Sequence, residues 1–170
     1  GHAGLVRKLS DNGNVYLTYS TATNINGGES DVGSSCGYGG LCGTSEQVGL
    51  SDPERVTNLE LGTKWELFGE RLLATAALFR ITKDNVMESV GDDYSSLGTL
   101  NTGKNQVQGV EFSITGAITD KLSAQFNATL MDSEVIEAFN QSNIGLALSN
   151  FSDNQAYIQL RYDATSTFSF

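Results

Sequence analysis

The sequence predicts an all-β chain of long antiparallel strands, and three observations lead to that prediction. Glycine accounts for 19 of the 170 residues and proline for only one, a composition that weakens helices; Thr, Ser, Asn and β-branched or aromatic residues are common and suit strands and turns. Apolar residues recur with a period of two, which is the period of a strand with one apolar face. The segments between these strands alternate between short turns and long polar connections.

Length, charge and hydropathy exclude several classes of protein. The 170 residues correspond to one domain, and 10 Lys and Arg against 20 Asp and Glu give a net charge of −10. Such a charge repels phosphate backbones, so nucleic acid is not an expected partner. No apolar run approaches the roughly 18 residues of a spanning helix, which excludes a helical membrane protein. The first 20 residues contain no export signal, which indicates a mature chain or an excised piece.

The expected strands follow one another along the chain, each with an apolar and a polar face. In the first clear alternation, Val15, Leu17 and Tyr19 lie opposite Tyr16 and Thr18. The next begins at Asn58. Its apolar face carries Leu59, Leu61, Thr63, Trp65 and Leu67, and its polar face carries Asn58, Glu60, Gly62, Lys64 and Glu66.

The remaining strands are long or less regular. The segment from Arg71 to Val86 alternates less cleanly, whereas Asn105 to Ile118 and Leu122 to Glu137 alternate over 14 and 16 residues. A further strand carries Ile158, Leu160 and Tyr162 on its apolar face. A new strand is expected after Thr165, which brings the total to about eight.

The connections predict that the two ends of the sheet differ. Short turns are expected at residues 10–14, 68–70, 119–121 and 164–166, and long connections at 24–52, 87–104 and 137–153. In an up-and-down meander, every second connection lies at the same end. Short turns at one end and long loops at the other are typical of outer-membrane barrels, and strands of 14 to 16 residues are long enough to cross a bilayer.

The pattern therefore favours an antiparallel up-and-down transmembrane β-barrel segment, with short periplasmic turns and long extracellular loops. A soluble β-sandwich or lectin-like fold stays open, because alternation does not say which face is inside. Trp65 and Tyr162 separate the two folds. They would join an aromatic girdle in a barrel and a buried core in a sandwich.

Three motifs resemble the TonB-dependent siderophore receptors of Gram-negative outer membranes. Residues 52–80 resemble the family's Pro-Glu opening, its N-x-E-x-G-x-K-W strand and its L-x-x-T-A-A-L-F-R return strand. The matching residues are Pro53, Glu54, Asn58, Glu60, Gly62, Lys64, Trp65, Thr75, Ala76, Ala77, Leu78, Phe79 and Arg80. The segment QVQGVEFSITGA at residues 106–117 is similar to the family's V-x-G-V-E strand, with Val107, Gly109, Val110 and Glu111 in register, and LTYSTA at 17–22 is similar to its Y-x-S-Y-S strand.

The resemblance implies a fold, a function and partners. The family's barrel has about 22 strands and encloses a plug domain, so residues 1–170 are expected to be part of the barrel domain, without the plug or the TonB box. The implied function is energised uptake of a ferric siderophore in the outer membrane. Implied partners are that siderophore, outer-membrane lipid and the TonB complex, which would bind regions missing here; no cofactor is expected.

Other functions stay open at this point. A related receptor for nickel, cobalamin or a sugar would give a similar sequence. A self-contained eight-stranded barrel with a structural or adhesive role would require the strand after Thr165 to pair with residues 4–9. A soluble carbohydrate-binding β domain is the third possibility. No catalytic grouping is recognisable, so an enzyme is not expected.

Candidate site residues fall in the long loops. Cys36 and Cys42 are expected to form a disulfide; free thiols or half a metal site are the alternatives, but His2 is the only histidine, which disfavours zinc. Tyr38 and Tyr94 are candidate ligand contacts. The adjacent Asp92 and Asp93 are expected to solvate a loop rather than bind calcium, so no metal site is predicted.

The charged residues of the polar faces form a second set of candidates. Glu60, Lys64, Glu111 and Arg161 are expected to face the lumen of a closed barrel. Such groups either pair across strands or bind the plug, and a structural role is the one we predict.

Overall fold

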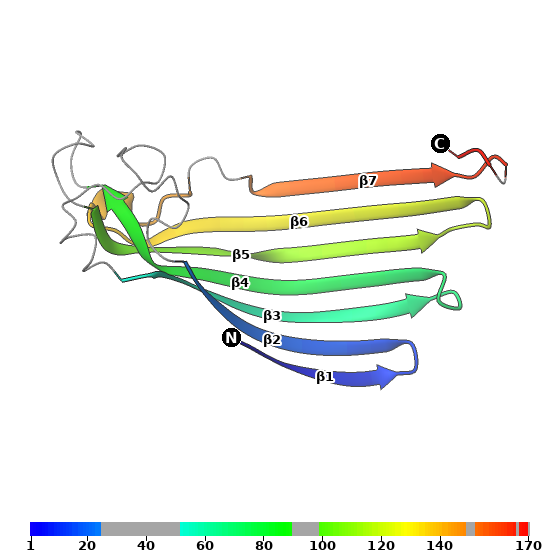
Figure 1. Cartoon of the computed structure of the whole chain (residues 1–170), viewed down its shortest axis with the longest axis horizontal. Coiled ribbons are helices and arrows are strands. Elements are labelled where there is room, and N and C mark those ends of the chain that lie inside the picture. Colours follow the sequence, from blue (N-terminus) through cyan, green and yellow to red (C-terminus); the bar gives the residue numbers. More distant parts are fainter. Residues whose placement is uncertain (25–51, 90–98, 149–151, 166, 170) are drawn as a thin grey trace.

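The computed structural model describes residues 1–24, 52–89, 99–148, 152–165 and 167–169. Seven strands form one antiparallel sheet whose spatial order is the order of the sequence (Figure 1). The strands are β1 (His2–Ser10), β2 (Gly13–Asn24), β3 (Glu54–Leu67), β4 (Leu72–Ser89), β5 (Thr99–Ala117), β6 (Leu122–Glu137) and β7 (Asn154–Tyr162). The all-β antiparallel prediction is confirmed, and the sheet is open, with β1 and β7 as its edges.

The two ends of the sheet differ as predicted. The turns that join β1 to β2, β3 to β4 and β5 to β6 all lie at one end, together with the segment after β7, whereas β2, β4 and β6 end and β3, β5 and β7 begin at the opposite end (Figure 1). Each short turn closes a hairpin in which the strands are paired up to the turn, as for Leu67 with Leu72 and Ala117 with Ser123. This end is called the turn end below, and the opposite end the loop end.

The expected eighth strand is not formed within the described residues. After β7 the chain turns back, and Asp163 and Ser169 form an isolated antiparallel bridge. In the described part of the chain, β1 is paired in the sheet with β2 alone. The pairing with residues 4–9 that an eight-stranded barrel requires is thus not among the pairings observed.

Strands β4 and β5 extend into the segment that the sequence predicts to be a long connection. The expected loop at residues 87–104 is shorter, because β4 continues to Ser89 and β5 begins at Thr99. The register shifts between Asp84 and Val86, and again between Val86 and Glu88, while Asn85 has a φ of 57°. Such a bulge interrupts the period of two in β4. The apolar alternation of the sequence therefore does not reveal that residues 86–89 pair with β5.

One face of the sheet, called the apolar face below, carries a continuous row of large aliphatic side chains. The register places six of them side by side across β1 to β6: Leu5, Leu17, Leu61, Leu78, Val110 and Leu130. Their exposed fractions range from 41% for Leu17 to 74% for Leu5. A soluble sandwich would bury this row, whereas a transmembrane barrel turns it to lipid.

The described residues contain almost no apolar core. Ala77 is the one buried hydrophobic residue among those whose side chains the structure describes. No helix in the described ranges has the length and apolar character needed to cross a membrane.

Both aromatic residues that separate the two folds lie on the apolar face near the turn end. Trp65 pairs in register with Gly13, and a Cβ atom at position 13 would overlap the Trp65 ring. Tyr162 pairs with Leu122 and is 39% exposed. Neither residue is in a core, which agrees with a girdle at the membrane interface.

A charge placed on the apolar face tests its contact with lipid. Phe112 lies two residues from Val110 on β5, on the same face and nearer the turn end. The centroid of its ring is 6.2 Å from the centroid of the Phe126 ring. We expect Phe112→Arg to lower the free energy of unfolding of the full-length receptor by about 2–4 kcal/mol, the cost of arginine near the bilayer midplane. Urea unfolding in lipid vesicles measures this cost.

The matched control is Gln106→Arg. Gln106 is on the same face of β5, six residues nearer the loop end than Phe112. It should cost no more than about 1 kcal/mol, because the penalty falls toward the interface. Equal costs at the two positions would contradict the assignment of this face to lipid.

Candidate functional site: the polar face of the sheet

The four charged residues predicted to face the lumen lie on one face of the sheet, opposite the apolar face. Glu60 and Lys64 are on β3, Glu111 is on β5 and Arg161 is on β7. The alternation of the paired strands places all four on this side, called the polar face below. Their structural role stays a prediction.

Tyr16 joins two of these residues into a cluster. Its hydroxyl donates a hydrogen bond of 2.5 Å to Glu60 Oε1, and Lys64 Nζ lies 5.4 Å from the centroid of its ring. Gly62 is the register partner of Tyr16, and a Cβ atom at position 62 would overlap the Tyr16 ring. The glycine therefore provides the space that the Tyr16 ring occupies.

The sequence analysis missed Tyr16 as the partner of Glu60 and Lys64. A signal was available, since an isolated glycine inside a strand marks a close approach of another group. Which group approaches Gly62 depends on the register between β2 and β3, and the sequence does not supply that register.

Glu111 lies in a ladder of polar and small side chains near the middle of the polar face. Its register partners are Ala77 on β4 and Thr129 on β6. In the next row toward the turn end, Ser113 Oγ donates a hydrogen bond of 2.7 Å to Asn127 Oδ1. At this level of the face, one hydrogen bond between small polar side chains joins β5 to β6.

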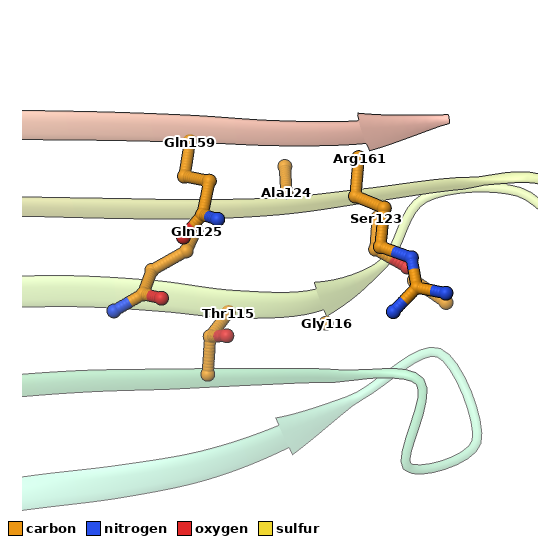
Figure 2. Close-up of a pocket in the computed structure, with 8 residues that line it drawn as sticks. Thr115, Gly116, Ser123, Ala124, Gln125, Gln159 and Arg161 are labelled. Atoms are coloured by element: carbon orange, nitrogen blue, oxygen red, sulfur yellow. The ribbon is translucent and has the colours of Figure 1, made fainter. Parts of the chain in front are cut away.

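Arg161 lines a hollow of about 290 Å³ at the turn end, formed by β5, β6 and β7 (Figure 2). Gln125 and Gln159 are register partners in its wall, as are Ser123 and Arg161, and Thr115 contributes a hydroxyl. Amide, hydroxyl and guanidinium groups together can donate to and accept from a polar chain segment.

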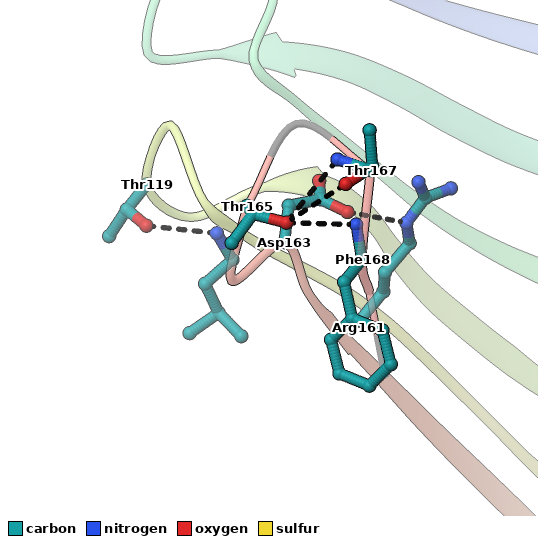
Figure 3. A network of polar contacts seen from close by, with 7 residues as sticks. Thr119, Arg161, Asp163, Thr165, Thr167 and Phe168 are labelled. Carbon is teal, nitrogen blue, oxygen red and sulfur yellow. Dashed lines mark hydrogen bonds and ion pairs between the residues drawn. The ribbon is translucent and has the colours of Figure 1, made fainter.

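The guanidinium of Arg161 is already engaged by the turn after β7 (Figure 3). Arg161 Nε donates to Asp163 Oδ1 at 3.0 Å, with the two side chains 65% and 40% exposed. Thr165 Oγ1 accepts from the amides of Thr167 and Phe168, at 3.3 and 3.1 Å, and holds the turn closed. An ion pair this exposed is worth less than about 1 kcal/mol.

The polar face also carries an apolar patch, which lies between its polar centre and the loop end. Phe79 and Ile81 on β4, Val107 on β5 and Met131 on β6 share this face with Glu60. The Phe79 ring packs against Gly109: a Cβ atom at position 109 would lie only 3.0 Å from Cζ of that ring. Phe79 also helps to explain why β4 alternates poorly, because both faces of the strand carry apolar side chains at residues 76–79.

The first residues of β3 are tied to β4 at the loop end. Lys83 Nζ lies 2.7 Å from Glu54 Oε2, and the Glu54 side chain is only 8% exposed. Asn85 Nδ2 donates to the carbonyl of Pro53 at 3.2 Å. The Pro-Glu opening of β3 is therefore held by polar contacts with β4.

Part of the long connection after β6 is ordered against β6. It contains a short 3₁₀ helix, Gln141–Asn143, after which Val135 N donates to Leu146 O and Gly145 N donates to Val135 O, both at 2.9 Å. Ser133 is buried, and its Oγ accepts from Leu148 N at 3.1 Å. The connection thus continues the pairing of β6 beyond the start of β7.

We expect Ser133→Ala to loosen the end of this connection. Loss of the bond to Leu148 N should favour local opening by about 1 kcal/mol, which is about fivefold faster hydrogen exchange of that amide. Exchange measured by mass spectrometry on the full-length receptor tests this. The amide of Gly145 is the internal control, because its acceptor is a backbone carbonyl; equal acceleration of both amides would contradict a local role for Ser133.

Six residues singled out in the loops lie outside the described residues: Cys36, Tyr38, Cys42, Asp92, Asp93 and Tyr94. The disulfide, the two ligand contacts and the solvating carboxylates stay predictions. Within the described ranges, no three His, Cys, Asp or Glu side chains are grouped so as to hold a metal ion.

Comparison with known families identifies the chain. The model of the family "TonB dependent receptor-like, beta-barrel" matches residues 1–170. This chain is a member of the TonB-dependent receptor family. The family resemblance is confirmed, and because the family's members are Gram-negative outer-membrane β-barrels, so is the predicted location.

Two relatives of this TonB-dependent receptor chain illustrate the match. The catecholate siderophore receptor Fiu of Escherichia coli K12 is 36% identical over 118 residues, which cover 69% of this chain and 14% of Fiu. The probable TonB-dependent receptor BfrD of Bordetella pertussis is 33% identical over 139 residues, which cover 82% of this chain and 17% of BfrD. The chain thus spans about a sixth of these relatives.

Solved receptor structures contain the same arrangement of strands. The closed form of the ferric-catecholate import receptor Fiu from E. coli matches 99% of this chain and 23% of its own, with a TM-score of 0.77 and 29% identity. The siderophore receptor PiuA from Acinetobacter baumannii matches 96% of this chain and 24% of its own, with a TM-score of 0.78 and 26% identity. The open sheet of this chain is consistent with part of such a barrel.

Proposed function

We propose that the protein containing this chain takes up a ferric siderophore across the outer membrane by TonB-dependent, energised transport. The chain supplies seven neighbouring strands of the barrel wall. The observation that carries the proposal is the match of 99% of the chain, at a TM-score of 0.77, to the wall of a receptor that imports ferric catecholates. Transport rather than catalysis is the role of this wall.

The two faces of the sheet support this role. The exposed aliphatic row suits the lipid side of a barrel, and the opposite face carries Tyr16, Glu60, Lys64 and Glu111. In the closed barrel these polar residues line the lumen, and the plug and the TonB box belong to parts of the protein other than residues 1–170. Tyr38 and Tyr94 are the proposed ligand contacts in the loops.

Uptake of radioactive iron tests the proposal. We expect deletion of the whole gene from the source bacterium to abolish import of one siderophore, and complementation to restore it. A ferric catecholate is the first ligand to supply, because the related receptor Fiu is named as a ferric-catecholate import receptor. Loss of uptake in a strain without TonB would establish the energy source.

The same strains separate the other cargoes. If the deletion leaves uptake of catecholate, hydroxamate and mixed siderophores unchanged but abolishes uptake of cobalamin, nickel or a sugar, the siderophore proposal is wrong. The assignment of this chain to the barrel wall would survive that result.

A further inference from the structure

The apolar face is hollowed into an open groove of about 730 Å³ that extends from β2 to the start of β7. Its floor is aliphatic, and its end toward the loops is polar. The aliphatic lining comprises Leu17, Leu59, Leu61, Leu78, Val110 and Leu130, and the polar end comprises Arg80, Gln108 and Asp132. Asn154, at the start of the edge strand β7, also lines the groove.

Arg80 is held over the end of this groove. Its Nε and Nη2 both donate to Gln108 Oε1, at 3.2 and 3.0 Å, and the two residues are register partners on β4 and β5. A guanidinium has five N–H donors, so this contact leaves others free to bind an anion. Arg80 is exposed and makes no ion pair with any residue that the structure describes.

Arg80 also lies at the border of the lipid-facing surface. Its row is one step nearer the loop end than the row of Leu78 and Val110, a rise of about 6–7 Å along the strands. A cation at that level meets the headgroups of the outer leaflet while the groove below it meets acyl chains. Asp132 lies two strands away, about 10 Å from the β4 backbone, and would repel a second anionic group.

We propose that this groove binds a phosphorylated lipid of the outer leaflet, with an acyl chain along the leucines and a phosphate on Arg80. The guanidinium matches a phosphate in shape and charge, and Gln108 fixes its orientation. An arginine that only extends its charge to the interface would not need a fixing partner or a groove beneath it. The proposal is independent of which cargo the receptor transports.

Lipid retention by the full-length receptor tests the proposal. The receptor is purified with phosphorylated lipid A or with its dephosphorylated counterpart carrying the same acyl chains, and retained lipid is counted by native mass spectrometry. We expect about tenfold preference for the phosphorylated lipid, which corresponds to about 1.4 kcal/mol. Arg80→Gln should abolish the preference, and Arg80→Lys should reduce it.

Two further variants locate the site. Arg55→Gln is the matched control, because Arg55 is an exposed arginine of the same face, four residues beyond Leu59 on β3; it should leave the preference unchanged. Leu78→Trp fills the groove and should reduce retention of both lipids. Heat-dependent migration of each variant on gels verifies that the barrel has folded.

Each other outcome overturns the proposal. If Arg80→Gln keeps the preference, or if Arg55→Gln loses it equally, the phosphate does not bind at this groove. If the receptor shows no preference between the two lipids but binds inorganic phosphate in a manner that Arg80→Gln abolishes, the arginine binds a free anion rather than a lipid. If Leu78→Trp retains both lipids fully, the groove does not hold an acyl chain.

Discussion

Gly116→Ala is expected to destabilise the full-length receptor by about 3 kcal/mol and to reduce the amount of folded protein in the outer membrane. Gly116 is near the end of β5, with a φ of 145°, a conformation that other residues rarely adopt. A Cβ atom there would also overlap the carbonyl oxygen of Arg71. That oxygen accepts a 2.9 Å hydrogen bond from Ala117 N, so it cannot move away without breaking the pairing of β4 and β5.

Gly69→Ala is the matched control for this effect. Gly69 also has a positive φ, 66°, but no atom lies within 4 Å of the Cβ position. Its substitution should cost only the conformational preference, about 1–2 kcal/mol. Urea unfolding of both variants separates strain from steric overlap, and equal losses would show that contact with Arg71 is unimportant.

Gly62→Ala is expected to cost about 2 kcal/mol, although alanine is normally favoured over glycine within a strand. The reason is the ring of Tyr16, which occupies the space of the missing side chain. A Cβ atom at position 62 would displace that ring. The hydrogen bond from Tyr16 to Glu60 and the contact with Lys64 would then be lost together.

A double-mutant cycle isolates this contact. In a Tyr16→Ala background the overlap is gone, so Gly62→Ala should become neutral or slightly stabilising, and the difference between the two backgrounds measures the coupling. Gly4→Ala is the control on the same face, because the nearest atoms to its Cβ position lie 3.5 and 3.6 Å away and need not move. An equal cost of Gly62→Ala in both backgrounds would exclude Tyr16 as the cause.

Several features of the fold were predictable because they depend on a period of two. The side chains of Leu59, Leu61 and Trp65 share one face of any extended strand, whatever it pairs with. The alternation of short and long connections likewise requires only that consecutive strands be neighbours. These local patterns sufficed for the strands, the two faces and the difference between the two ends of the sheet.

Other features depend on register and were not predictable from one segment at a time. The pairing beyond Asp84 depends on a bulge that shifts the strand and hides its alternation. The apolar patch of Phe79, Ile81, Val107 and Met131 on the polar face arises because three separate strands bring these residues to one level. Ser133 acquires its role from a connection that folds back 15 residues later.

The sequence by itself determined long antiparallel strands with an apolar and a polar face, because backbone geometry sends alternate side chains to opposite faces. The resemblance of its motifs to a receptor family, not the alternation, indicated that the apolar face meets lipid. The tertiary structure alone decided which residues meet across the strands. Tyr16 reaches Glu60 over Gly62, and Arg80 is fixed by Gln108 above a groove of leucines. The physical reason is that these contacts join residues 28 to 44 positions apart, and only the register of paired strands brings them within reach.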